Sequence, residues 1–206
     1  MWQLARNILL IIICCSANLV HAEYFDNNYQ VEVIIFEHTS PKRFASEHWP
    51  KFVGQLETTK AINLNDIESP ETSSLADKEG ISLVGPQQML LKSDLSKIKT
   101  SKGARLIQFK AWRQPMITGD RSTPIYFTDP KGQEIAAIFA VKPMRNNVFS
   151  IKIDLIYKLQ ADEAYLASAV REIRFTTDAK VKKKEVYYID HPVIGILVAI
   201  SPVATS

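Results

Sequence analysis

Cysteine is nearly absent from the sequence. Two of the 206 residues are cysteine, and both, Cys14 and Cys15, lie in an apolar stretch close to the N-terminus. If that stretch is removed during export, the mature chain has no thiol. This excludes a disulfide framework, a cysteine nucleophile and a cysteine-ligated metal site, and leaves the hydrophobic core to stabilise the fold.

Histidine and catalytic motifs are also scarce. The four histidines have no ligand spacing between them, which argues against a zinc site; they are His21, His38, His48 and His191. The sequence contains neither G-x-S-x-G nor H-E-x-x-H, and it shows no convincing pair of carboxylates for glycan hydrolysis. We therefore expect a protein that is not an enzyme and that needs no cofactor or metal.

No hydrophobic run is long enough to cross a bilayer. The longest one near the N-terminus, residues 8–15, falls well short of the roughly 20 residues that a spanning helix needs. It follows Arg6 and precedes a small-x-small pattern that ends at Ala22. We expect residues 1–22 to be a signal peptide, cleaved after Ala22, and the mature protein to start at Glu23 in the bacterial periplasm. A permanent membrane anchor is the alternative.

A strong charge of one sign is missing as well. The formal net charge is +3, which gives a mild preference for anionic partners and no argument for nucleic acid. Hydrophobic residues make up 46% of the chain, a composition typical of a globular domain.

Hydrophobic alternation predicts a mainly antiparallel sheet of about seven strands. The clearest strand is 149–159, in which alternate residues from Phe149 to Tyr157 are apolar and should face the core. Others are expected at 29–38, 104–115, within 124–133, at 134–141, within 164–176, at 180–189 and at 193–200. Hairpin-length turns such as 144–147 join most of them.

One helix of about four turns is predicted at 86–101. Pro86 suits its first turn, Gly103 suits its end, and apolar residues recur between them at helical spacing. We expect this helix to cover one face of the sheet. The fold class is then α+β, with residues 23–206 as a single domain and 39–80 as a long, partly irregular insertion.

The Asp190-His191 pair has two interpretations. It is either a catalytic dyad or, with Pro192, the corner that turns one strand into the next. The corner is favoured, because no nucleophile motif accompanies the pair, and contact of His191 with a ligand is the main alternative.

Trp112, Arg113 and Gln114 form a second candidate site. Strand alternation places Trp112 on the side of Gln108 and Lys110, opposite Phe109. An exposed tryptophan beside Arg and Gln would suit stacking on a sugar ring. The other interpretation, equally weighted, is a tryptophan covered by the helix or by the 39–80 segment.

The lysines at the far end of the chain form a basic run. Lys180, Lys182, Lys183 and Lys184 are typical of a solvated hairpin tip. The alternative is contact with a polyanion, either lipid headgroups or the free carboxylates of cell-wall peptide stems.

Three segments, in order behind the signal peptide, carry a resemblance to a known family. They are HAEYFDNNYQVEVIIFEH, AWRQP and EVYYIDHPVIGILVAI, and the last is the most specific, with Tyr188, Asp190, His191, Pro192 and Gly195. The chain resembles the CsiV peptidoglycan-binding proteins over most of its mature length. Phe109 and Lys110 stand where the family pattern often has a histidine.

The resemblance implies a non-enzymatic periplasmic protein that binds peptidoglycan and supports a bifunctional penicillin-binding synthase together with its outer-membrane lipoprotein activator. The ligand-binding residues that we expect on this basis are Trp112, Arg113, Gln114, Arg171, Arg174, Tyr188, Asp190 and His191. Two alternatives remain: a protein-protein adaptor without glycan affinity, and a wall hydrolase built on Asp190-His191.

Overall fold

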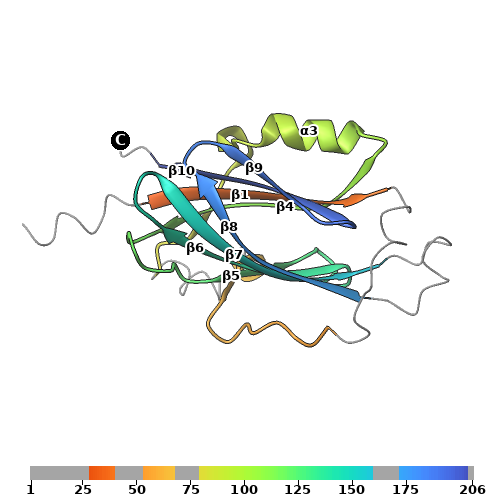
Figure 1. Ribbon diagram of the computed structural model, residues 1–206, viewed down its shortest axis with the longest axis horizontal. Coiled ribbons are helices and arrows are strands. Elements are labelled where there is room, and N and C mark those ends of the chain that lie inside the picture. Colours follow the sequence, from red (N-terminus) through yellow and green to blue (C-terminus); the bar gives the residue numbers. More distant parts are fainter. Residues whose placement is uncertain (1–27, 40–52, 68–78, 160–171, 204–206) are drawn as a thin grey trace, which may run out of the picture.

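In the part of the chain that the structure describes, two β-sheets pack face to face and an α-helix lies on the outside (Figure 1). The structure, a computed structural model, describes residues 28–39, 53–67, 79–159 and 172–203. Its strands are β1 (Asn28–His38), β2 (Ile62–Asn63), β3 (Ser82–Leu83), β4 (Ala104–Pro115), β5 (Ile125–Thr128), β6 (Ile135–Pro143), β7 (Val148–Lys158), β8 (Glu172–Lys182), β9 (Val186–Asp190) and β10 (Ile194–Pro202). Its helices are the 3-10 turns η2 (Leu64–Asp66) and η3 (Pro86–Gln88), and α3 (Lys92–Thr100).

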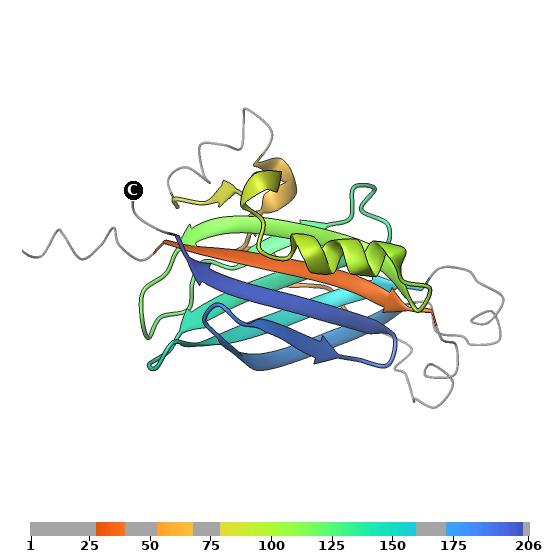
Figure 2. The ribbon, with the colours of Figure 1, turned by 90° about the horizontal axis from the view of Figure 1, so that it is seen from above.

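The two sheets have five strands each. The first has the order β3-β4-β1-β10-β9 and the second the order β2-β5-β6-β7-β8. Every pair is antiparallel except β2 with β5. The strands nearest the two termini, β1 and β10, lie side by side in the middle of the first sheet (Figure 2). Residues far apart in sequence therefore meet on its faces.

The main core fills the space between the sheets. The apolar face of β7, from Phe149 to Tyr157, points into it as the alternation predicts. The first sheet contributes Val31, Val33 and Ile35 from β1, together with Trp112 from β4. A smaller cluster on the outer face of the first sheet packs against α3. The residues of β1 from Gln30 to Glu37 are buried on both faces, which explains why Ile34 and Phe36 accompany Glu32 on the face that points away from the main core.

The strand count and the number of sheets differ from the prediction. The described residues form ten strands in two sheets, where about seven strands in one sheet were expected. The two-residue strands β2 and β3 are too short to show alternation. The expected strand at 180–189 is two strands, because Lys184 has a positive φ of 63° and the chain passes there from β8 in the second sheet to β9 in the first.

The helix is shorter than predicted, because a buried carboxylate fixes its start. Glu32 on β1 is 0% exposed, and it accepts the backbone N–H of Leu90 at 2.6 Å and that of Leu91 at 2.8 Å. A carboxylate at this position satisfies unpaired N–H groups and interacts favourably with the helix dipole. Regular helix therefore begins at Lys92, and Pro86 lies in the preceding 3-10 turn.

Candidate functional site

Asp190 and His191 form the corner between β9 and β10. The His191 N–H donates to the Ile194 carbonyl at 3.1 Å and closes the turn, and the Val193 N–H donates to Nδ1 of His191 at 3.3 Å. The Val193 carbonyl in turn accepts from the backbone of His38 at 2.8 Å, which ties the corner to the end of β1. The structure thus shows the corner that the sequence favoured.

The two side chains of the pair have different surroundings. His191 packs edge-on against Phe175 of β8, with ring centroids 5.0 Å apart. Burial lowers the pKa of His191 to about 4, although the charge of Asp190 raises it, and His38 contributes a smaller lowering. The imidazole is therefore neutral near pH 7. Asp190 instead accepts a hydrogen bond from the Tyr188 hydroxyl at 2.5 Å and lies 3.3 Å from Nε2 of His38.

A cluster of aromatic and polar side chains surrounds Asp190 on the outer face of the first sheet. We call Phe36, His38, Tyr188 and Asp190 the Tyr188 cluster. The rings of Phe36 and Tyr188 are nearly parallel, with centroids 6.2 Å apart, and His38 lies edge-on to Phe36 at 5.4 Å. The Tyr188 hydroxyl is 3.3 Å from Nε2 of His38. The cluster thus combines stacked rings with a short chain of polar contacts.

Gly195 makes room for this arrangement. It pairs with Phe36 on β1 and with Asp190 on β9. A Cβ atom at position 195 would lie only 2.3 Å from Cζ of Phe36, a distance that no real side chain tolerates. The absence of a side chain lets the Phe36 ring lie across β10 toward Tyr188.

The helix leaves the Tyr188 cluster uncovered. α3 runs along β1 and β4, and the part of the face made by β10 and β9 lies beside it (Figure 2). The exposed fraction is 45% for Tyr188 and 55% for the side chain of Asp190. Phe36, at 9% exposed, supports them from below.

Trp112 and Gln114 lie in the interior. Both point between the sheets, at 0% and 1% exposed, and the Trp112 indole N–H donates to the Gln114 side chain at 2.5 Å. Trp112 also lies edge-on to Phe139 of the second sheet, with centroids 6.3 Å apart. The sugar-stacking interpretation of Trp112 is therefore wrong for this fold. The tryptophan is covered, although by the second sheet and not by the helix.

Arg113 points the opposite way from its neighbours in the sequence. It lies on the outer face of the first sheet, half-buried, and donates to Gln88 at 2.9 Å and to Gln30 at 3.3 Å. It belongs to the polar network at the start of the helix, because the amide of Gln30 in turn donates to Glu32 at 2.6 Å. Trp112, Arg113 and Gln114 consequently do not form one surface.

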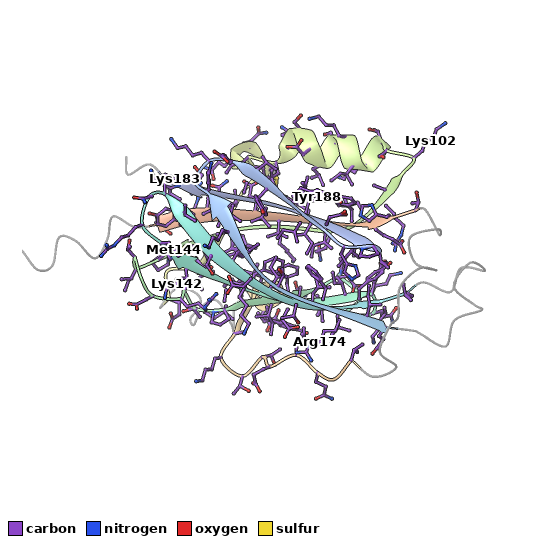
Figure 3. All side chains as sticks on the ribbon, in the orientation of Figure 1. Lys102, Lys142, Met144, Arg174, Lys183 and Tyr188 are labelled. Atoms are coloured by element: carbon purple, nitrogen blue, oxygen red, sulfur yellow. The ribbon has the colours of Figure 1, made fainter. Side chains whose placement is uncertain are left out.

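Arg174 lies on the other side of the molecule from Tyr188 (Figure 3). It projects from the outer face of the second sheet and forms a two-pronged ion pair with Asp154 at 2.7 and 2.8 Å, plus a bond to the Val53 carbonyl at 3.0 Å. The guanidinium holds the pKa of Asp154 below its usual value. Arg171 is outside the described residues. One site cannot contain both Arg174 and Tyr188.

A second ionic network closes one end of the sandwich. Arg105 bonds to Glu37 at 2.8 Å, to the Tyr157 hydroxyl at 2.8 Å, and to Glu134. Burial alone would lower the pKa of Arg105, but the bonds to Glu134 and Glu37 outweigh it and raise the pKa. Burial also raises the pKa of Tyr157. Because one guanidinium bonds to groups from both sheets, the network is suited to holding the sheets together.

Metal-binding clusters and membrane-spanning helices are both absent from the parts of the chain that the structure describes. No group of three or more His, Cys, Asp or Glu side chains there is placed to hold a metal ion. None of the helices in those parts is long and apolar enough to cross a membrane.

Sequence reasoning missed two members of the Tyr188 cluster. His38 and Phe36 lie 150 or more residues before Tyr188 and Asp190, and only the pairing of β1 with β10 and of β10 with β9 brings them together. The signal that was available is that two strands within the segments of the family resemblance end in aromatic and polar residues: β1 ends in FEH and β9 ends in YID.

The chain matches the model of a known family. The model of the family described as "Peptidoglycan-binding protein, CsiV" matches residues 6–203, nearly the whole chain. That description names a binding protein and not an enzyme. A comparison with curated proteins found no match, and a comparison with solved structures found none either.

Proposed function

The chain belongs to the CsiV family, and from this premise we propose that it is a periplasmic, non-catalytic peptidoglycan-binding protein whose binding surface is the Tyr188 cluster. The observation that carries this proposal is the exposure of Tyr188, at 45%, above a stacked and buried Phe36. An aromatic ring fixed from one side and accessible on the other suits the apolar face of a sugar.

The polar members of the cluster include a hydrogen-bond acceptor for a ligand. The carboxylate of Asp190 accepts, and it suits the hydroxyl and amide N–H groups of amino sugars or the ammonium groups of peptide stems. His38, whose side chain is 15% exposed, lies 3.3 Å from both Asp190 and the Tyr188 hydroxyl and positions them. His191 contributes by shaping the corner rather than by touching the ligand.

Of the residues expected from the family resemblance, Tyr188 and Asp190 remain in the proposed site. Trp112 and Gln114 leave it because they are buried between the sheets. Arg113 and Arg174 leave it because the first is bonded into the start of the helix and the second is ion-paired on the opposite face.

We further propose that binding serves cell-wall synthesis, in support of a bifunctional penicillin-binding protein and its outer-membrane lipoprotein activator. This role comes from the family resemblance. The alternative is an adaptor that binds those proteins and has no glycan affinity. Retention on purified sacculi distinguishes the two, because only the binding protein co-sediments when no other protein is present.

The test compares Tyr188→Ala with Tyr187→Ala in a sacculus pull-down. Tyr187 is the matched control, because it is 41% exposed on the same strand but alternates to the other side of β9. We expect Tyr188→Ala to lower retention about tenfold, in line with the loss of one stacked ring. Tyr187→Ala should bind like the wild type.

Two further variants sharpen the result. Asp190→Asn should weaken retention, and Arg174→Ala, on the opposite face, should leave it unchanged. Equal retention of Tyr188→Ala and the wild type would move the site away from this face. Failure of the wild-type protein to bind sacculi at all would favour the adaptor.

A further inference from the structure

Three turns meet at the end of the sandwich where β1 begins. The N–H of Gly119, in the connection between β4 and β5, donates to the Pro143 carbonyl at the end of β6 at 2.9 Å. The N–H of Lys183, in the turn between β8 and β9, donates to the Asn147 carbonyl in the turn between β6 and β7 at 2.8 Å. Figure 3 places Lys142, Met144 and Lys183 together at this end.

These turns carry a dense positive charge, so we call this region the basic end. Its six cations are Lys142, Arg145, Lys180, Lys182, Lys183 and Lys184. The formal net charge of the whole chain, by comparison, is only +3. The acids nearby include Asp120, Asp178, Glu185 and Glu79, the last of which accepts a hydrogen bond from Thr123 in the connection between β4 and β5. Asp178 is bonded to Ser150 and lies 3.3 Å from Arg121, and Glu185 lies 3.9 Å from Lys182. The excess of cations therefore remains.

Two large apolar side chains project among these cations. Ile117 is 50% exposed and Met144 is 39% exposed. The bond between Gly119 and Pro143 holds their two turns against each other. Single exposed apolar residues are ordinary on protein surfaces, but a pair on adjacent turns at a lysine-rich end of the molecule has the chemistry of a membrane interface.

We propose that the basic end docks on the surface of an anionic lipid bilayer. The cations would interact with lipid phosphates, and Ile117 and Met144 would enter the boundary between headgroups and acyl chains. Wall peptide stems also carry carboxylates that could pair with the lysines. They are hydrated, however, and provide no apolar environment in which Ile117 and Met144 could be buried. The lipid surface is therefore the occupant that accounts for both features of this end.

The position of the basic end gives the docking a direction. β1 starts there at Asn28 and ends at His38 in the Tyr188 cluster. Its 11 residues correspond to a length of about 35 Å in an extended strand. A molecule docked through the basic end thus presents the Tyr188 cluster away from the bilayer. This orientation rests on the function proposed above, whereas lipid binding itself does not.

The test is co-sedimentation of the purified protein with vesicles of phosphatidylcholine, with and without phosphatidylglycerol. All variants carry the same N-terminal segment, so differences between them report on the basic end. We expect binding only to the anionic vesicles, weakening as salt is raised. The triple variant Lys180→Glu, Lys182→Glu, Lys184→Glu should lower the partition coefficient at least about tenfold.

A matched triple variant controls for net charge. Lys92→Glu, Lys99→Glu, Lys102→Glu makes the same change at exposed positions on and just after α3. It should bind the vesicles within about twofold of the wild type, because charges more than a Debye length of about 10 Å from the membrane contribute little. Equal losses in the two triple variants would overturn the proposal.

A second pair of variants tests the apolar contribution. Ile117→Ser with Met144→Ser should weaken vesicle binding about threefold or more, in proportion to the apolar groups removed. Leu90→Ser, at a residue 48% exposed beside the helix, should have no effect. No binding of the wild type to anionic vesicles would overturn the proposal.

Sacculus retention separates this proposal from the previous one. The triple variant at the basic end should keep its sacculus binding, and Tyr188→Ala should keep its vesicle binding. Loss of sacculus binding with unchanged vesicle binding in the triple variant would assign these lysines to the wall and overturn lipid docking.

Discussion

Strands β4 and β9 carry aromatic residues in similar sequence settings but place them in opposite environments. Trp112 is followed by Arg and Gln, and Tyr188 is followed by Ile and Asp. Both lie in segments that carry the sequence resemblance to the CsiV family. Trp112 is 0% exposed and Tyr188 is 45% exposed.

The cause of the difference is the position of each strand in the sandwich. The side of β4 that carries Trp112 faces the second sheet, where Phe139 contacts the indole. β9 is an edge strand, and Tyr188 is on the outer face, beside the helix and not beneath it. Exposure of an aromatic residue thus depends on what the topology places opposite it, and not on its neighbours in sequence.

The largest effect that separates the two regions is on stability. Trp112→Ala should lower the free energy of unfolding by about 3–5 kcal/mol, because it leaves a cavity between the sheets. Tyr188→Ala should lower it by only about 1 kcal/mol, the value of an exposed aromatic pair. Urea unfolding, followed by circular dichroism, measures both.

Trp112→Phe tests whether the hydrogen bond of the indole also matters. It keeps a ring in the core but leaves the Gln114 side chain without the indole donor, at an expected cost of about 1–3 kcal/mol. If Trp112→Ala unfolded at the same urea concentration as Tyr188→Ala, the conclusion that Trp112 is buried and Tyr188 exposed would be contradicted.

Much of the fold was predictable from local patterns. The strands β1, β4, β7 and β10 and the hairpin turn at 144–147 agree with hydrophobic alternation and turn composition. Alternation shows which residues share a face of one strand, but not which strands share a sheet. The division into two sheets, and with it the burial of Trp112, was therefore not predictable from these patterns.

The candidate site was predictable only in part. The terminal segment identified Tyr188 and Asp190, but His38 and Phe36 join them through pairing across nearly the whole chain. Glu32 shows the same limit, because an acid on a strand is ordinarily exposed and the fold buries this one at the start of a helix.

The second prediction concerns the support beneath Tyr188. Gly195→Ala should cost about 1–3 kcal/mol, as overpacking does, because its Cβ would overlap the Phe36 ring. Displacing that ring should also weaken sacculus retention by disturbing Tyr188. The double variant Gly195→Ala, Phe36→Leu should recover part of the stability, since the smaller side chain removes the overlap.

The outcome of that double variant sharpens the comparison. Recovered stability without recovered sacculus binding would show that the stacked Phe36 ring positions Tyr188 for the ligand. A Gly195→Ala variant as stable as the wild type would mean that the Phe36 ring is not packed against β10. Tyr188 would then have no packed ring beneath it, whereas Trp112 packs against Phe139.

The third and smallest effect is a pH dependence at the corner beside Tyr188. The folded state lowers the pKa of His191 from 6.5 to about 4, mainly by burial, while Asp190 opposes the shift and His38 adds to it. Below pH 6.5 the unfolded chain binds a proton that the folded chain does not, so stability falls as the pH drops and the loss is complete below about pH 4. From pH 7 to pH 5 we expect a loss on the order of 1–2 kcal/mol.

Urea unfolding of His191→Asn across the same pH range tests this origin. The Asn side-chain oxygen can replace Nδ1 as acceptor for the Val193 N–H, so the corner is kept while the titrating group is removed. The variant should lose most of the pH dependence between pH 7 and pH 5. The aspartates whose pKa is lowered, Asp129, Asp154 and Asp178, act only at lower pH, since their usual value is 3.8. An unchanged slope in His191→Asn would show that the histidine is not buried in the corner, and the region around Tyr188 would then be more open than its contacts indicate.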